Sequence, residues 1–213
     1  MEMLESRMMF AAVVSITTTG TYIDVVGDGS DNVLSVTGNF NSGSDSFFGS
    51  YTINTSAGTS LSVDGVNVGT SYFSPDGVLP DAWDLKPWRF QMGGGNDFVS
   101  ASNSYFPAVT VDLGAGNDRV ELRLMSSADF GLTGSNQATR GVSISAGDGD
   151  DNIYLTYGAR KAVYGSVSIF PGAGRDRVTI ADVPENQPER IGISGEVGDI
   201  RFAGAAEPFD EKS

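Results

Sequence analysis

One short turn motif recurs five times in this chain, and it constrains the fold more than any other feature. The pattern Gly-x-Gly-x-Asp-x-[Val/Ile] begins at residues 27, 93, 114, 147 and 172. Runs in which apolar and polar residues alternate surround most copies, such as VTVDL before and RVELRL after the copy at 114. Because period-two alternation rich in Val and Ile is typical of half-buried strands, each copy predicts a strand, a tight turn and a second strand.

The spacing of the copies indicates how these units are arranged. The last four copies are separated by 21, 33 and 25 residues, which suits one coil of a parallel β-solenoid whose coils stack ~4.8 Å apart. The turns would then lie above one another in one column. The longer gap between 27 and 93 is expected to hold two or more degenerate coils, because 41–53 and 61–70 also contain strand-and-turn patterns.

We therefore predict an all-β fold, a right-handed parallel β-solenoid (β-helix or β-roll) with irregular insertions. A β-sandwich is the alternative architecture, but it does not explain why one turn sequence recurs. The solenoid domain is expected to cover 21–204, with an irregular loop or cap at 73–88. Residues 1–20 form an N-terminal capping segment and 205–213 an acidic tail. No apolar stretch approaches the ~20 residues that a membrane span needs, so no span is expected.

Composition narrows the available chemistry. The 213 residues include no Cys and no His, which argues against a disulfide framework, zinc, copper or haem sites, and a His general base. The formal net charge is −14, with 19 Asp and 8 Glu. Asp favours turns over helices, and an acidic chain is a poor partner for nucleic acid. Cations and neutral glycans are the expected partners.

The repeated turn offers oxygen ligands. Glycine at two alternate positions permits positive φ, so that several carbonyl oxygens can be directed at one point, and the Asp adds a carboxylate. Calcium takes ~6–8 oxygen ligands, more than one turn supplies but within reach of two stacked turns. The sequence thus predicts Ca²⁺ between neighbouring turns, where it would offset repulsion between stacked Asp residues. The alternative is that each Asp only hydrogen-bonds its own turn.

The motif resembles the hemolysin-type (RTX) calcium-binding nonapeptide, Gly-Gly-x-Gly-x-Asp-x-U-x, in which U is a large apolar residue. The resemblance implies a parallel β-roll with calcium between adjacent turns, with the firmest sites between 93–97 and 114–118 and between 114–118 and 147–151. On this pattern the metal ligands would be Asp31, Gly93, Gly95, Asn96, Asp97, Gly114, Gly116, Asn117, Asp118, Gly147, Gly149, Asp150, Asp151 and Asp176, with Gly172 and Gly174 as further backbone ligands.

The chain departs from that family pattern in two ways. There is one motif per coil instead of a tandem array, and the first family glycine is replaced in every copy. Its place is taken by Val26, Met92, Leu113, Ala146 and Pro171. In the last copy Arg175 and Arg177 flank Asp176, which puts cations where calcium would bind. These arginines would instead pair with Asp176 or with the neighbouring turn.

The opening MEMLESRMMFAA carries a second, shorter resemblance. Residues 4–12 are similar to the LEPR-XLL motif at the N-termini of large bacterial surface and matrix-like proteins, with Ser6 in place of Pro and Met9-Phe10 in place of the Leu pair. A chance match within a first strand is the alternative. Both resemblances imply an extracellular or bacterial cell-surface location. Two acids against one Arg and a short apolar run are unlike an ordinary signal peptide, which implies non-standard secretion.

Together these features predict an exported calcium-binding structural or adhesive surface protein. The second hypothesis is a β-helix protein that binds or degrades polysaccharides. For sugar binding, an aromatic shelf would consist of Trp83, Trp88, Tyr72 and Phe73, although capping of a solenoid end is the alternative role of these residues.

Candidate catalytic residues form no recognisable constellation, so no enzyme is predicted. The pairs considered for lyase or hydrolase chemistry are Asp182 with Arg177, Asp112 with Arg123, and Lys161 beside Arg160.

Overall fold

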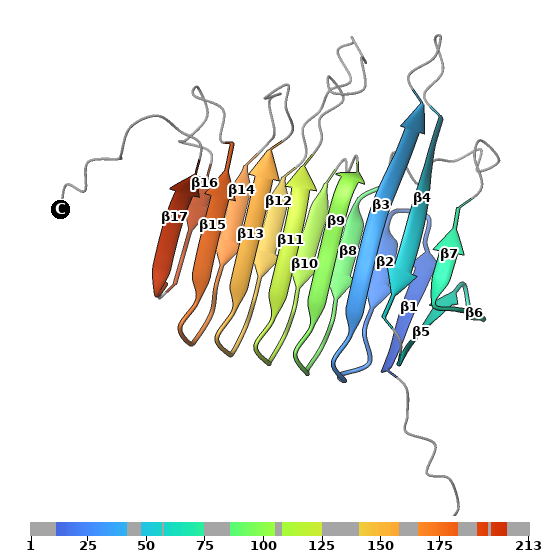
Figure 1. Ribbon diagram of the computed structural model, residues 1–213, viewed down its shortest axis with the longest axis horizontal. Helices are drawn as coiled ribbons and strands as arrows, with labels where there is room; N and C mark the ends of the chain where they lie inside the picture. The colour runs from blue at the N-terminus through green and yellow to red at the C-terminus, as the bar shows by residue number, and fades with distance from the viewer. Residues whose placement is uncertain are drawn as a thin grey trace, which may run out of the picture.

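The computed structural model shows an all-β chain (Figure 1). It describes residues 12–41, 48–56, 58–74, 86–104, 108–124, 141–157, 166–182, 191–195 and 197–203. Within these ranges the chain forms strands, turns and bends but no helix. The prediction of an all-β fold is therefore confirmed. Most of the N-terminal motif and the whole of 205–213 lie outside the described residues.

The described strands form two mixed sheets, and neither sheet closes on itself. Sheet A contains, in spatial order, β16 (Ile191–Ile193), β14 (Val167–Phe170), β12 (Val142–Ser145), β10 (Val109–Asp112), β8 (Trp88–Gln91), β2 (Ile23–Val26), β1 (Ala12–Thr18), β5 (Thr59–Val63) and β6 (Val66–Gly69). Sheet B contains β17 (Asp199–Ala203), β15 (Arg177–Ala181), β13 (Asn152–Tyr157), β11 (Arg119–Leu124), β9 (Phe98–Ser104), β3 (Val33–Asn41), β4 (Phe48–Thr55) and β7 (Ser71–Phe73).

From β8 to β17 successive strands alternate between the two sheets. Within each sheet they pair in parallel, and the register is regular: Val111 lies beside Phe90 on one side and Ile144 on the other. Inward side chains therefore form continuous rows from strand to strand. The motif turns, which connect β8 to β9, β10 to β11, β12 to β13 and β14 to β15, gather along one edge of the molecule (Figure 1).

The N-terminal part departs from this parallel arrangement. Antiparallel pairs join β1 to β2, β3 to β4, β4 to β7 and β5 to β6. The expectation of two or more parallel coils between the first two motifs is therefore wrong for the described part of that gap. The β5–β6 connection shows the reason. Its central residues Asp64 and Gly65 have φ of 47° and 81°, a two-residue hairpin turn that leaves no chain for a parallel crossover.

Two of the expected non-strand segments overlap strands. β1 begins at Ala12, so sheet A already includes residues of the expected segment 1–20. The expected irregular loop 73–88 contains the last residue of β7 and the first residue of β8, while residues 75–85 lie outside the described part of the chain.

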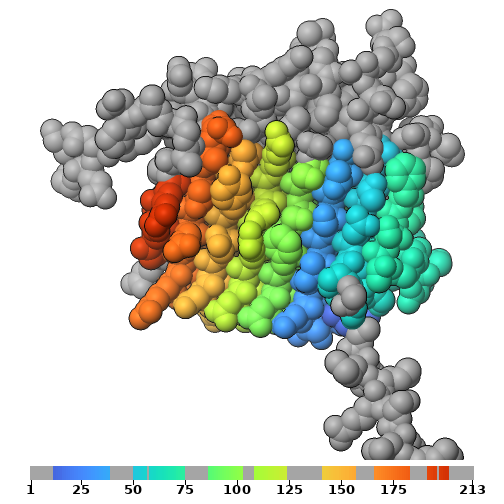
Figure 2. Space-filling model, viewed as in Figure 1, coloured from blue at the N-terminus to red at the C-terminus, as the bar shows by residue number. Residues whose placement is uncertain are grey.

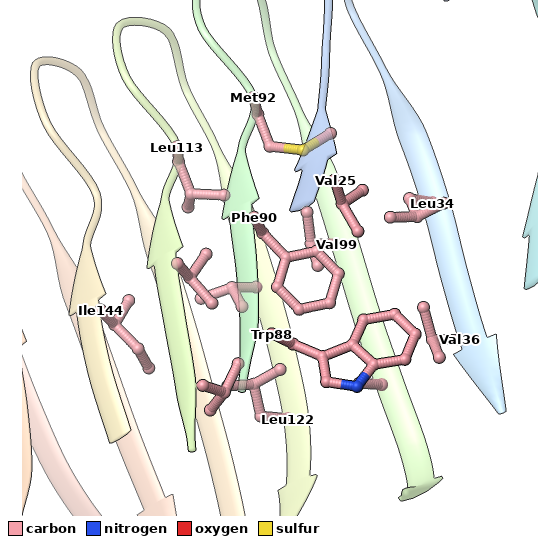
Figure 3. Close-up of a cluster of buried hydrophobic side chains, with 14 of the residues drawn as sticks. Val25, Leu34, Val36, Trp88, Phe90, Met92, Val99, Leu113, Leu122 and Ile144 are labelled. Carbon is pink, nitrogen blue, oxygen red and sulfur yellow. The ribbon is translucent and has the colours of Figure 1, made fainter. Parts of the chain in front are cut away.

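The hydrophobic core lies between the sheets, where alternate residues of most strands are buried (Figure 3). Trp88 is fully buried, with its ring centroid 5.0 Å from Tyr51 and 5.9 Å from Phe90. The expectation that Trp88 contributes to an exposed aromatic shelf is therefore wrong, because its position in β8 points its ring inward. Phe73 of the same expected shelf is 53% exposed.

Candidate metal site in the turn column

Four motif turns stack directly on one another, and we call them the turn column: residues 93–97, 114–118, 147–151 and 172–176. Parallel bridges join Gly94 to Ala115, Ala115 to Asp148, and Asp148 to Ala173. The carbonyl of Gly93 accepts a hydrogen bond from the Ala115 N–H at 3.0 Å, and the equivalent bonds of the next two steps are 3.0 and 2.9 Å. The backbone alone thus holds the turns in register.

Close stacking explains why the motif needs glycine. Gly114 and Gly116 have φ of 97° and 149°, a region that disfavours side chains. A Cβ added to Gly116 would lie 1.6 Å from the carbonyl oxygen of Gly95, and one added to Gly114 would lie 1.6 Å from that of Gly93. The carbonyl groups of one turn therefore face the glycine Cα atoms of the next turn.

A buried row of carboxyl groups runs along the inside of the column, and we call it the aspartate row. Its members are at most 2% exposed: Asp97, Asp118, Asp151 and Asp176. Each Oδ1 accepts a backbone N–H from the preceding turn. Asp118 accepts from Asp97 at 2.7 Å, and Asp151 accepts from Asp118 at 2.8 Å. Each Asp therefore links two turns, and does not merely hydrogen-bond its own turn as the alternative interpretation had it.

A second row, of exposed side chains, runs beside the aspartate row. Its hydrogen bonds have the opposite sense, because each side chain accepts an N–H of the following turn and not of the preceding one. Asn96 Oδ1 accepts the Asn117 N–H at 2.9 Å, and Asn117 Oδ1 accepts the Asp150 N–H at 2.8 Å. Asp150 Oδ1 in turn accepts the Arg175 N–H at 2.9 Å. Consecutive turns are thus connected by two sets of side chains: those of the buried row bind the preceding turn, and those of the exposed row bind the following turn.

The first motif copy joins the column in a register that is shifted by one residue. Because Val33 pairs with Phe98, Asn32 occupies the position equivalent to Asp97. The Asn32 N–H donates to Asp97 Oδ1 at 2.7 Å, whereas Asp31 Oδ1 accepts the Asn96 N–H at 2.7 Å. Asp31 therefore belongs to the exposed row and not to the aspartate row, where the sequence pattern placed it.

Sequence reasoning missed Asn32, although a signal for it exists. Leu34, Val36 and Gly38 are buried in β3, and the first buried strand residue comes two positions after the aspartate in the later copies. Counting back two positions from Leu34 leads to Asn32, so the phase of the strand, and not the glycine pattern, identifies the equivalent residue.

The second carboxylate oxygen of each Asp, Oδ2, distinguishes the aspartate row chemically. Among the described residues, the Oδ2 atoms of all four members are buried without a hydrogen-bond partner. Burial raises the pKa of Asp97, Asp118 and Asp151 to about 6, against the opposing effect of the hydrogen bonds from backbone N–H groups. A buried ionised oxygen without a partner is costly, so these groups favour either a proton or a cation.

The donor set suits a hard cation in type and charge, because Ca²⁺ prefers carboxylate and carbonyl oxygens. The expected backbone ligands are less available. The carbonyls of Gly93, Gly114 and Gly147 already accept hydrogen bonds from the next turn. Among the described residues no group of three or more His, Cys, Asp or Glu could hold a metal ion. The carbonyls of Gly95, Gly116 and Gly149 face glycines of the next turn instead. The Oδ2 atoms are therefore the oxygens without a partner that a cation could use, and carbonyls or water would have to supply the rest of the ~6–8 oxygens.

The arginines of the last copy do not neutralise the aspartate row. The side chain of Arg177 lies 3.7 Å from Asp199 on sheet B. Arg175 joins the column through its backbone N–H. The pairing of these arginines with Asp176 that the sequence suggested is not observed, because β15 directs Arg177 outward.

The candidate catalytic residues are not assembled in the described part of the chain. Asp112 is exposed on sheet A and Arg123 is exposed on sheet B, so the two side chains lie on opposite faces. Arg177 forms its ion pair with Asp199. Arg160 and Lys161 lie outside the described residues.

Comparison of the chain with family models, with curated proteins and with solved structures gave no match. In the ranges that the structure describes, there is no helix long and apolar enough to cross a membrane. The functional interpretation therefore depends on the geometry of the turn column itself.

Proposed function

We propose that this chain is a right-handed parallel β-solenoid protein with a structural or adhesive role outside the cell, and that its turn column binds Ca²⁺. The parallel pairing from β8 to β17 and the stacked glycine turns support the solenoid. The observation that carries the calcium proposal is the row of buried Oδ2 atoms without partners.

The chain's own residues prepare the site in a simple way. Backbone N–H groups hold Oδ1 of Asp97, Asp118 and Asp151 in fixed positions, so each Oδ2 is oriented before any cation arrives. Bound Ca²⁺ would compensate the charge of these carboxylates and connect consecutive turns. Asp176, at the end of the row, would contribute the last Oδ2.

Calcium binding would act through folding. An ion that binds only the folded chain adds its binding free energy to stability. Extracellular calcium modules have dissociation constants of roughly 10⁻⁴–10⁻³ M, so such a chain would be stabilised outside the cell, where the ion is abundant. The resemblances to the RTX repeat and to the LEPR-XLL motif support this location and a surface or matrix role.

Thermal unfolding in EDTA and in about 5 mM CaCl₂, followed by circular dichroism, tests the proposal. At about ten times the dissociation constant, one site adds roughly 1.4 kcal/mol, so the melting temperature should rise by several degrees. MgCl₂ at the same concentration is the ion control, because Mg²⁺ dehydrates reluctantly.

Two variants with the same change of charge locate the effect. Asp118→Asn removes one member of the aspartate row and should reduce the calcium response. Asp148→Asn alters an exposed residue of the neighbouring turn and should leave the response intact. An unchanged melting temperature in calcium, or equal responses of the two variants, would contradict the proposal.

A further inference from the structure

The outer face of sheet B is positively charged, although the chain as a whole is acidic. Four arginines project from β11, β15 and β17, together with two acids, and β13 between them carries no charge on this face. We call this set the arginine face: Arg119, Arg123, Arg177, Arg201, Glu121 and Asp199. Four positive and two negative groups leave a net charge of +2, whereas the whole chain has −14.

The ion pairs on this face leave positive charge unneutralised in two places. Asp199 lies 2.8 Å from Arg201 and 3.7 Å from Arg177, so two guanidinium groups share one carboxylate. Arg119 pairs with Glu121 on the same strand. For Arg123, an exposed residue, no ion pair is found among the described residues. One excess positive charge thus lies on β11 and another at β15–β17.

Neutral groups that can bind a sugar lie between these charges. Tyr154 on β13 is 40% exposed, and it stands in one row with Glu121, Thr179 and Arg201 across four adjacent strands. At ~4.8 Å per strand this row spans roughly 14 Å. In Figure 2 the strands of sheet B lie side by side as parallel ridges across a broad, even face. An extended polymer could therefore lie across these strands without obstruction by the described residues.

We infer that the arginine face binds a linear acidic polysaccharide, with carboxylate or sulfate groups, that runs across β11 to β17. Guanidinium groups bind carboxylate and sulfate oxygens through two parallel hydrogen bonds, and an exposed Tyr offers a sugar ring an amphipathic surface. The charge decides against nucleic acid. Duplex DNA carries one negative charge per ~1.7 Å of its axis, which a net +2 matches poorly, whereas an acidic polysaccharide carries about one charged group per sugar ring. The inference rests on the adhesive part of the proposed function and not on calcium.

Binding of the full chain to polygalacturonate, chondroitin sulfate, neutral dextran and single-stranded DNA tests the inference, measured by biolayer interferometry at low and physiological salt. Polygalacturonate and chondroitin sulfate separate carboxylate from sulfate recognition. All measurements are made in calcium, so that the chain is in one state throughout. We expect one or both acidic polysaccharides to bind, with an affinity that decreases as salt rises, and dextran not to bind.

Two double variants with the same change of net charge separate the arginine face from general electrostatics. Arg123→Gln with Arg201→Gln should weaken binding by about tenfold or more. Arg89→Gln with Arg175→Gln removes arginines of sheet A and of the turn column and should change it less than about twofold. Tyr154→Ala should weaken binding without changing its salt dependence.

Four results would overturn the inference: no binding of either acidic polysaccharide, equal losses in the two double variants, equal binding of dextran, or tighter binding of DNA. The effect of calcium on the melting temperature of the same variants distinguishes the calcium proposal from the polysaccharide proposal. A calcium response without glycan binding removes only the present inference, whereas glycan binding without a calcium response removes only the calcium proposal.

Discussion

Replacement of Gly116 by alanine tests the turn column directly, because this glycine lies where two turns approach most closely. Its φ of 149° is unfavourable for alanine. The new Cβ would lie 1.6 Å from the Gly95 carbonyl oxygen, a backbone atom that cannot rotate away. The turns 93–97 and 114–118 would have to separate.

The size of the effect follows from the contacts that separation removes. Backbone strain at such a φ costs about 1–3 kcal/mol. The hydrogen bonds from Gly95 N–H to Ala115 O and from Ala115 N–H to Gly93 O, both 3.0 Å, would lengthen, at about 1 kcal/mol each. The total is roughly 3–5 kcal/mol, which for a chain of this size lowers the melting temperature by about 10 °C.

Gly58→Ala provides the matched control. Gly58 also has a positive φ, 101°, but an added Cβ would find nothing within 4 Å. It should lose only the strain energy, about 1–3 kcal/mol. Urea unfolding of both variants, followed by circular dichroism, measures the difference. If Gly116→Ala cost no more than Gly58→Ala, the close stacking of the turns would be refuted.

Two other predictions concern the aspartate row and the core. In EDTA, the free energy of unfolding should decrease from about pH 4 to pH 6, because Asp97, Asp118 and Asp151 have pKa values of about 6 in the folded chain and 3.8 ordinarily. Their stabilising contribution is complete below 3.8 and is lost as the pH rises through about 6. Asp118→Asn should reduce this decrease by at most about 3 kcal/mol, and a decrease equal to that of the unmodified chain would contradict the assignment. Trp88→Ala should cost about 3–5 kcal/mol in urea unfolding, against less than about 1 kcal/mol for the exposed Phe73→Ala, and equal costs would contradict burial of the Trp88 ring.

Much of the candidate site was predictable because its information is local. Two glycines, an Asp and a following apolar residue specify a tight turn between strands, and the recurrence of this pattern in four copies 21 to 33 residues apart indicates that the turns align. The structure agrees for the turns at 93, 114, 147 and 172. The burial of Asp97 and its partners, by contrast, depends on the neighbouring turns, which close over each carboxyl group.

The first motif copy shows where local information ends. Its residues match the motif, yet Asn32 and not Asp31 occupies the position equivalent to the aspartate row. The reason is that the register is set by the pairing of β3 with β9. Likewise, β3 and β4 form an antiparallel pair instead of two coils. Short strands of similar composition suit either arrangement, and the choice depends on connection length and on which neighbour is available.

The sequence by itself determined that the chain is all-β, that its turns recur and require glycine, and that each later turn carries the motif Asp, since these properties follow from backbone sterics and period-two alternation. Only the tertiary structure decided which oxygens remain without partners, which copy is shifted by one residue, that Trp88 is buried, and that four of the arginines lie on one face of sheet B. These properties depend on contacts between residues far apart in the chain, and no short stretch of sequence contains them.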